Sequence, residues 1–160
     1  MSGWENFFIA EVGASAALAG LVFVGISINL TRIMAITGLP ERALEALIVL
    51  ATVLIMSSLL LVPGQPPVLT GVEVLVFGLI DWLLVITILV NYLRELESQY
   101  WRQFAIRVIL SQIATLPFVI AGAVLLIWGN AGLYWLVPAV IFSFILALHD
   151  AWVLLIEINR

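Results

Sequence analysis

The feature that most constrains the fold is a nearly uninterrupted apolar stretch at residues 6–31. As an α-helix, these 26 residues extend for about 39 Å at ~1.5 Å per residue, which is longer than the ~30 Å hydrocarbon core of a bilayer. The stretch therefore predicts a helix that crosses a membrane.

This helix has two distinct faces when its residues are placed at helical spacing. One face carries small or slim side chains, namely Gly13, Ala16, Ala17, Gly20, Val24 and Ser27. The other carries Glu11, Ser15, Ala19, Val22, Ile26 and Asn29. Small residues let another helix approach closely, and polar side chains are unfavourable against lipid. We expect this helix to be enclosed by the other spans, with Ser27 and Asn29 capping or bridging helices.

The composition extends this conclusion to the whole chain. Of its 160 residues 64% are hydrophobic and 10% are charged, whereas a soluble domain carries about 25% charged residues. We expect an all-α, polytopic membrane bundle that occupies residues 1–160 as a single transmembrane domain. The net charge of −4 argues against binding to nucleic acid, which requires clustered basic residues.

Several chemistries lack the residues they need. The chain has no cysteine, and His149 is its one histidine, so we expect no disulfide, no metal site and no cofactor. The G-x-S-x-G, H-E-x-x-H and Walker motifs are missing from the sequence, and Asp81 and Asp150 are expected at different depths, which disfavours an aspartate dyad. We expect that the protein is not an enzyme. The first residues carry no positive side chain, so we also expect no cleavable signal peptide.

Short polar or proline-rich segments divide the rest of the chain. They are residues 32–40, the PGQPP segment at 63–67, the polar run at 94–103 and the GNAG turn at 129–132. Proline stops a helix or confines it to its first turn, and glycine favours turns. The sequence thus predicts five spans, at about 6–31, 41–62, 70–93, 104–128 and 133–158, with a kink at Pro117.

The basic residues give an orientation. All are arginines: Arg32, Arg42, Arg94, Arg102, Arg107 and Arg160. With five spans, every one of them falls on the same side of the membrane. Because cytoplasmic segments are enriched in positive charge, we expect the N-terminus outside and the C-terminus in the cytoplasm.

Three acidic residues are candidates for an ion or proton path. Asp81 is expected ~15 Å deep, where a carboxylate costs at least ~2.5–3.5 kcal/mol. It shares a stripe with Gly71 and Gly78, so it should face another helix closely. It could be a proton or cation site, or a neutral or hydrogen-bonded acid that fixes helix packing. Glu11 and Glu73, near the outer ends of their spans, could form an acidic ring in an oligomer or simply contact interfacial water.

Charged residues nearer the cytoplasmic side suggest ion pairs. Arg107 and Asp150 should lie at similar depths, which favours a structural clamp between them over a gate or ligand site. His149 is expected to be a packing residue, with a proton relay to Asp150 as the alternative. The acidic Glu41 and Glu45 and the nearby Arg32 and Arg42 are expected to form ordinary interfacial pairs.

The first 65 residues resemble a group of small bacterial membrane proteins. The resemblance is carried by GASAALAGLVFVGISINL at 13–30, LPERALEAL at 39–47 and LVPGQ at 61–65. Some members are loosely labelled as modulators of a membrane-bound AAA protease. The resemblance implies a multi-pass protein of the bacterial inner membrane, and it carries over no catalytic motif or functional residue.

Two functions are compatible with these patterns. Five spans are few for a monomeric transporter, so we expect a homo-oligomer. The first hypothesis is a channel or proton-linked permeation protein for cations, with Asp81, Glu11 and Glu73 on or near the path. The alternative is a non-transporting regulator or assembly factor that binds other membrane proteins through the helix-packing residues Gly13, Ala16, Gly20 and Ser27.

Overall fold

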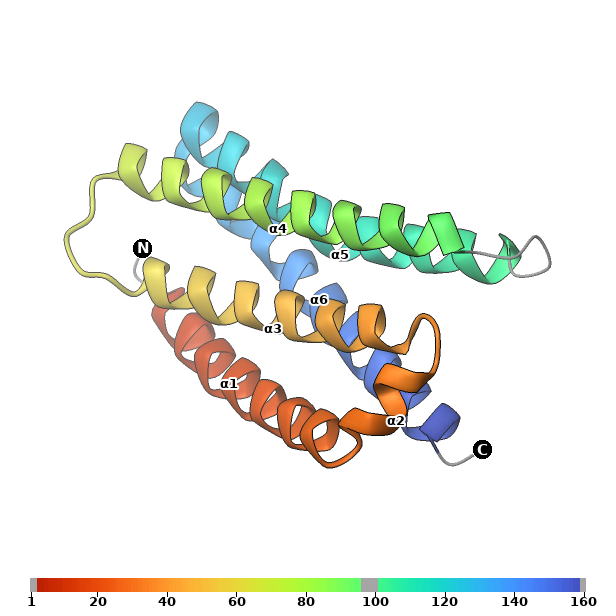
Figure 1. The fold of residues 1–160 in the computed structure, drawn as a ribbon. Helices are drawn as coiled ribbons and strands as arrows, with labels where there is room; N and C mark the ends of the chain where they lie inside the picture. Colours follow the sequence, from red (N-terminus) through yellow and green to blue (C-terminus); the bar gives the residue numbers. More distant parts are fainter. Residues whose placement is uncertain (1–2, 96–100, 159–160) are drawn as a thin grey trace.

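The computed structural model describes residues 3–95 and 101–158, and every regular element in these ranges is helical (Figure 1). The order is α1 (Glu5–Ile28), α2 (Leu30–Ala35), α3 (Leu39–Leu60), α4 (Pro67–Glu95), α5 (Trp101–Trp128), the 3-10 turn η2 (Gly129–Gly132) and α6 (Leu133–Ile158). The prediction of an all-α bundle is confirmed. Residues 96–100, in the predicted polar turn, lie outside the described residues.

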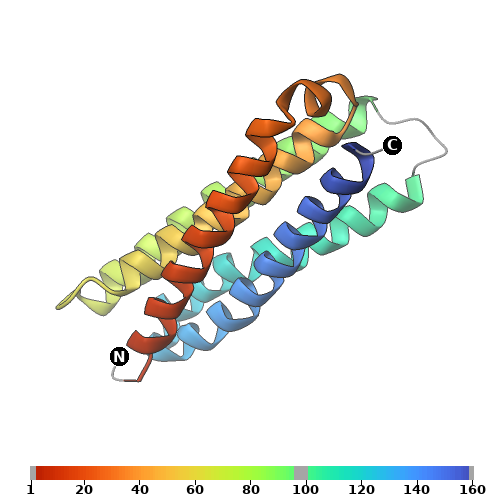
Figure 2. The same cartoon turned by 90° about the horizontal axis from the view of Figure 1, so that it is seen from below.

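Four helical stretches are long and apolar enough to cross a membrane: Glu5–Ile28, Leu39–Leu60, Pro67–Arg94 and Trp101–Ile156. The last of them contains α5, η2 and α6. Its glycine-bounded turn begins at Gly129, which has a φ of +62°, a value that glycine adopts without strain. The chain reverses there, and α6 runs back along α5 (Figures 1 and 2).

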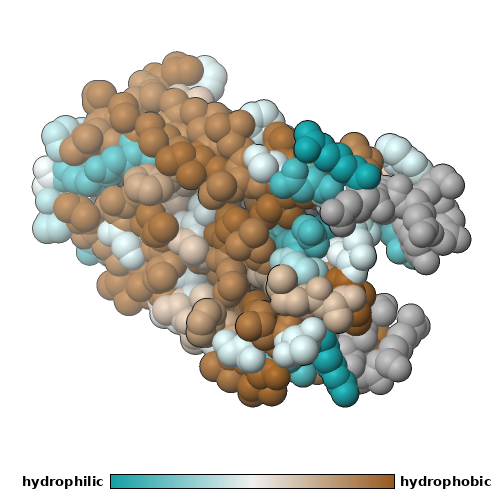
Figure 3. Space-filling view, in the orientation of Figure 1, coloured by the Kyte–Doolittle hydropathy of each residue, from teal (hydrophilic) through white to brown (hydrophobic). Residues whose placement is uncertain are grey.

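The connections between the helices lie at the two ends of the bundle. The start of α1, the loop before α4 and the η2 turn lie at one end, whereas α2, the start of α5 and the end of α6 lie at the other (Figure 1). Hydrophilic residues lie mostly toward these ends on the face drawn in Figure 3, and the surface between them is largely apolar. Large apolar side chains such as Leu21 and Leu83 are exposed in the middle of their helices, as expected for contact with lipid.

The first predicted span is interrupted at Asn29, which separates α1 from α2. Asn29 has φ −108° and ψ 12°, outside regular helical geometry, and its N–H bonds to the Ile26 carbonyl in a tighter turn. The Asn29 side chain donates to the Gly25 carbonyl, and Ser27 donates to the Phe23 carbonyl. Both side chains bond to carbonyl groups at the end of α1, so of the two expected roles the structure fits capping, by Asn29, and not bridging between helices.

The prediction that the first span is enclosed is also wrong. In the most apolar 18-residue stretch of each helix, 17% of α1 is buried, against 56% of α3, which lies between α1 and α4. The face with the small residues points away from the bundle, and all of these residues are exposed: Gly13, Ala16, Ala17, Gly20, Val24 and Ser27. The contact with the bundle is made instead by the buried Phe8 and Ser15 and by the partly buried Leu18, Ala19 and Val22, because a face of small residues buries little apolar area within one chain.

The closest contact between helices is that of α4 with α5. A Cβ on Gly122 would stand 2.5 Å from the Leu75 Cα, and one on Gly78 would stand 3.0 Å from the Phe118 carbonyl carbon. Asp81 does face another helix closely, as expected, but that helix is α3, where Thr52 bonds to it, whereas Gly71 and Gly78 of the same stripe lie against α5. Small residues bring the two backbones together, as in many membrane helix pairs.

This contact gives the first testable prediction. Gly122→Ala should lower the free energy of unfolding by ~1–3 kcal/mol, because the added methyl meets backbone atoms that can move only with the whole helix. Thermal unfolding in detergent micelles measures the change. Gly20→Ala is the matched control, since a Cβ there meets nothing within 4 Å. Equal stability of the two variants would contradict the close contact.

Candidate functional site

Among the residues whose burial the structure describes, four ionisable side chains are buried inside the bundle, one on each of α3, α4, α5 and α6. Glu45 and Asp150 have no exposed surface, Asp81 is 2% exposed and Arg107 is 3% exposed. A charged group in a membrane interior costs at least ~2.5–3.5 kcal/mol unless it is paired. Their partners therefore determine what this site can do.

The central pair joins Glu45 on α3 to Arg107 on α5. The Nε and Nη2 atoms of Arg107 donate to Glu45 Oε2 at 3.0 and 2.6 Å. Ser111, one turn further along α5, donates to the other carboxylate oxygen. The guanidinium carbon of Arg107 also stands 5.1 Å from the centre of the Tyr92 ring, a cation–π distance. Both carboxylate oxygens of Glu45 are thus satisfied without water.

A second pair joins Arg42, which lies one turn before Glu45 on α3, to Asp150 on α6. The Arg42 Nη1 atom lies 2.9 Å from Asp150 Oδ1, and the Arg42 side chain is 17% exposed. The neighbouring His149 is 46% exposed, with its Nδ1 atom 3.5 Å from the same oxygen. His149 is therefore close to Asp150, as a relay would need, but its ring lies largely outside the packed interior.

The predicted clamp between Arg107 and Asp150 is wrong. Each residue is paired, but with a different residue of α3: Arg107 with Glu45, and Asp150 with Arg42. The physical reason is the position of α3, which contacts both α5 and α6. Arg42 and Glu45 are three residues apart and so lie on one side of α3, where each can reach a different neighbour.

Asp81 is the deepest of the four. It is the midpoint of the 29-residue α4, and its Oδ1 atom accepts a hydrogen bond of 2.8 Å from the Thr52 hydroxyl. Thr52 lies two turns beyond Glu45 on the same side of α3, about 10 Å further along the helix axis toward the middle of the bundle. We call the set Arg42, Asp150, Glu45, Arg107, Ser111, Thr52 and Asp81 the polar column.

Three atoms of the polar column have no hydrogen-bond partner among the described residues: Asp81 Oδ2, Arg107 Nη1 and Asp150 Oδ2. A buried polar atom left unpaired costs ~1–3 kcal/mol. A proton on a carboxyl oxygen, or an exchangeable water molecule, would remove part of this cost. The column can therefore hold protons chemically, and its hydroxyl groups can both donate and accept them.

The other two predicted acids lie elsewhere. Glu73 on α4 accepts a 2.9 Å hydrogen bond from the Gln65 amide. Glu11 on α1 is half-buried, and its Oε2 atom has no partner among the described residues. Because α3 lies between α1 and α4, one chain does not bring Glu11 and Glu73 together. An acidic ring made by several chains stays a prediction.

Sequence reasoning missed the roles of Glu45 and Thr52. Glu45 was expected to form an interfacial pair near the end of its span, but it is completely buried. The spacing of the residues could have indicated this burial. Glu45, Val49, Thr52 and Met56 lie on one face of α3 at helical spacing, and all four are buried in the structure. A polar pair on an otherwise apolar, core-facing stripe marks residues that need partners from other helices.

Comparisons with protein-family models, curated proteins and solved structures gave no match to this chain. The resemblance of its first 65 residues to small bacterial membrane proteins stays a prediction. Within the part of the chain that the structure describes, no three His, Cys, Asp or Glu side chains are grouped so as to hold a metal ion. The site is therefore assessed from its own geometry.

The pairing of Glu45 with Arg107 is testable by a double-mutant cycle. Glu45→Gln and Arg107→Gln should each lower the free energy of unfolding by ~3–5 kcal/mol, because each leaves a buried charge without its partner. The loss of unfolding free energy in the double variant should be ~0.5–3 kcal/mol smaller than the sum of the losses in the two single variants. Unfolding in detergent micelles measures these values.

Arg102→Gln is the matched control, since Arg102 is exposed near the start of the same helix, and it should change stability by less than ~0.5 kcal/mol. Additive losses for Glu45→Gln and Arg107→Gln would show that the pair does not form. Coupling of Arg107 to Asp150 that exceeds its coupling to Glu45 would restore the clamp inferred from the sequence.

Proposed function

We propose that the chain is a multi-pass protein of the bacterial inner membrane whose five spans are α1, α3, α4, α5 and α6. Each of these helices has at least 22 residues, enough for ~33 Å of helix. The segments that carry Arg32, Arg42, Arg94, Arg102 and Arg107 lie at one end of the bundle (Figure 1), which supports a cytoplasmic position for that end. Arg160 lies outside the described residues.

This topology predicts that the two ends of the chain face different compartments from each other. A reporter fused after Arg160 should be active in the cytoplasm, and one inserted at Gln65 should be active outside. The reason is that three proposed spans, α4, α5 and α6, separate Gln65 from Arg160. Paired alkaline phosphatase and green fluorescent protein fusions measure this. The same compartment for both reporters would contradict the five-span arrangement.

We propose further that the protein moves protons, or cations coupled to protons, and that the polar column is its path. The observation that carries this proposal is Asp81, which lies at the middle of α4 with one oxygen bound to Thr52 and the other unpaired. An ionisable side chain at this depth is costly and in membrane proteins commonly belongs to an ion or proton pathway.

The arrangement favours proton-linked permeation over an open channel. Asp81 and Glu45 are surrounded by protein, so a hydrated cation has no room beside them in this conformation. A proton needs only hydroxyl groups, carboxyl groups or water molecules within hydrogen-bond reach, and Thr52 and Ser111 supply hydroxyl groups to Asp81 and Glu45. The ~10 Å of helix between Glu45 and Thr52 requires water molecules to connect these two pairs. The guanidinium groups of Arg42 and Arg107 compensate the negative charges of Asp150 and Glu45. Toward the outer end, Glu73 and Glu11 are the acids that could continue the path.

The alternative is a regulator or assembly factor that acts through helix contacts without transport. It is favoured by the exposed small-residue face of α1, where Gly13 and Gly20 have open space around the Cβ position. The same face supports a homo-oligomer, because small residues allow a helix from another chain to approach closely. In this alternative, the polar column only fixes the packing of α3 with its neighbours.

Proton flux into liposomes separates the two functions. Reconstituted wild type should acidify a pyranine-loaded interior under a pH gradient and a potassium diffusion potential, and Asp81→Asn should reduce the rate to that of empty liposomes. Asparagine keeps the size of the side chain and an acceptor for Thr52, but it cannot carry the proton. Glu5→Gln, which removes an exposed acid outside the polar column, should leave the rate unchanged.

Background flux for the wild type would refute the transport proposal. If Gly20→Leu then abolished association with another membrane protein, the regulator would be the better function. Equal, non-zero flux in wild type and Asp81→Asn would show that ions move along a path that does not use the polar column.

A further inference from the structure

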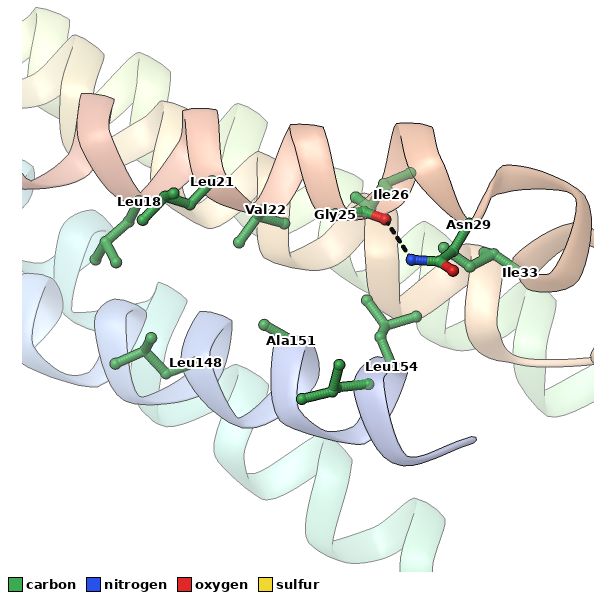
Figure 4. Close-up of a pocket in the computed structure, with 11 residues that line it drawn as sticks. Leu18, Leu21, Val22, Gly25, Ile26, Asn29, Ile33, Leu148, Ala151 and Leu154 are labelled. Carbon is green, nitrogen blue, oxygen red and sulfur yellow. Dashed lines mark hydrogen bonds between the residues drawn. The ribbon is translucent and has the colours of Figure 1, made fainter. Parts of the chain in front are cut away.

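A groove separates the second half of α1 from α6. Its volume is about 240 Å³, and its walls include Leu18, Val22 and Ile26 on α1 and Leu148, Ala151 and Leu155 on α6. Gly25 and Ala151 lie on opposite walls (Figure 4), and their small side chains leave the space between the helices open. The groove is almost wholly apolar, and Asn29, at its end, is its one polar lining residue among those that the structure describes.

The length and position of the groove match one leaflet of a bilayer. Its lining begins at Leu18, near the middle of α1, and reaches Asn29 at the end of that helix. These 11 residue steps extend for about 16 Å, which is close to half of the ~30 Å hydrocarbon core. A lipid acyl chain runs over the same distance, from the headgroup region to the bilayer centre.

The volume of the groove selects between two apolar occupants. The whole empty space between the walls of the groove is about 670 Å³, whereas a helix of ~16 Å length and ~10 Å diameter occupies about 1,200 Å³. An extended hydrocarbon chain is much thinner and fits a narrow space between two helices. The groove is therefore suited to a lipid chain rather than to a helix from a second copy.

The charge at the end of the groove indicates which lipid it would take. Ile33 lines this end, and the preceding residue, Arg32, is exposed on α2. The segments that carry the other described arginines lie at the same end of the bundle. Arginine binds phosphate groups in bidentate geometry, and the Asn29 amide can donate to an ester or phosphate oxygen.

We propose that this groove binds an anionic phospholipid, with an acyl chain between α1 and α6 and the phosphate beside Asn29 and Arg32. Such a lipid would cover apolar side chains of α1, which is otherwise held mainly by α3. It would thereby join the peripheral helix to the rest of the bundle. This binding is independent of proton movement through the polar column.

Native mass spectrometry tests the proposal directly. Purified protein in detergent receives equal amounts of phosphatidylglycerol and phosphatidylcholine, and the wild type should retain one phosphatidylglycerol molecule. Gly25→Leu should retain about tenfold less, because its side chain takes the place of about two lipid methylenes. A Cβ at Gly25 meets nothing within 4 Å, so this variant is expected to fold. Ala151→Leu fills the groove from the opposite wall.

Two matched controls complete the experiment. Gly20→Leu introduces the same side chain on the exposed face of α1 and should retain lipid as the wild type does. Arg32→Gln should remove the preference for phosphatidylglycerol, whereas Arg102→Gln should keep it. Equal lipid retention by Gly25→Leu, Ala151→Leu and wild type would overturn the proposal, as would equal retention of both lipids by the wild type. A lipid-free wild-type dimer that Gly25→Leu dissociates would assign the groove to a second copy instead.

Discussion

The structure depends most on the buried ion pair between Glu45 and Arg107. Neither charge can face lipid at acceptable cost, so α3 and α5 must be placed where the two side chains meet. Removing either partner would leave the other charge buried and unpaired, which is more costly than never having had the pair. The pair therefore fixes the position of α3 relative to α5 much more specifically than apolar contacts do.

α3 also makes the other polar contacts between helices in the polar column. Arg42 binds Asp150 on α6, and Thr52 binds Asp81 on α4. With Glu45, these residues occupy about three turns of α3 and reach three different helices. This explains why α3, and not the more conspicuous first span, is the central element. It also links packing to function, because the groups that hold the helices together are those that could carry a proton.

The peripheral position of α1 has consequences of a different kind. α1 packs mainly on α3, through residues that include Phe8, Ser15 and Val22, and the groove separates its second half from α6. One consequence is an exposed face of small residues, and another is the apolar groove beside Gly25. In a membrane, lipid or another protein must cover both surfaces. Among the five long helices, α1 thus has the least contact within one chain.

Much of the architecture could be read from the sequence because it follows from local properties. Helix length, the turns at PGQPP and GNAG, the grouping of the arginines and the depth of Asp81 all depend on the spacing of residues along the chain. The close approach of α4 to another helix could be inferred in the same way from Gly71 and Gly78. These features require no knowledge of which helices are neighbours.

Only the tertiary structure decided which charges pair and which helix is central. Arg107 could have met Asp150 or Glu45 at a similar depth, and the choice depends on the position of α3 between α5 and α6. The two faces of α1 were visible in the sequence, but their periodicity does not specify which one turns inward. Which charges pair and which helix is enclosed depend on how the helices are arranged around one another. The pattern along one helix shows the face on which a residue lies, but it does not show which residue of another helix lies beside it.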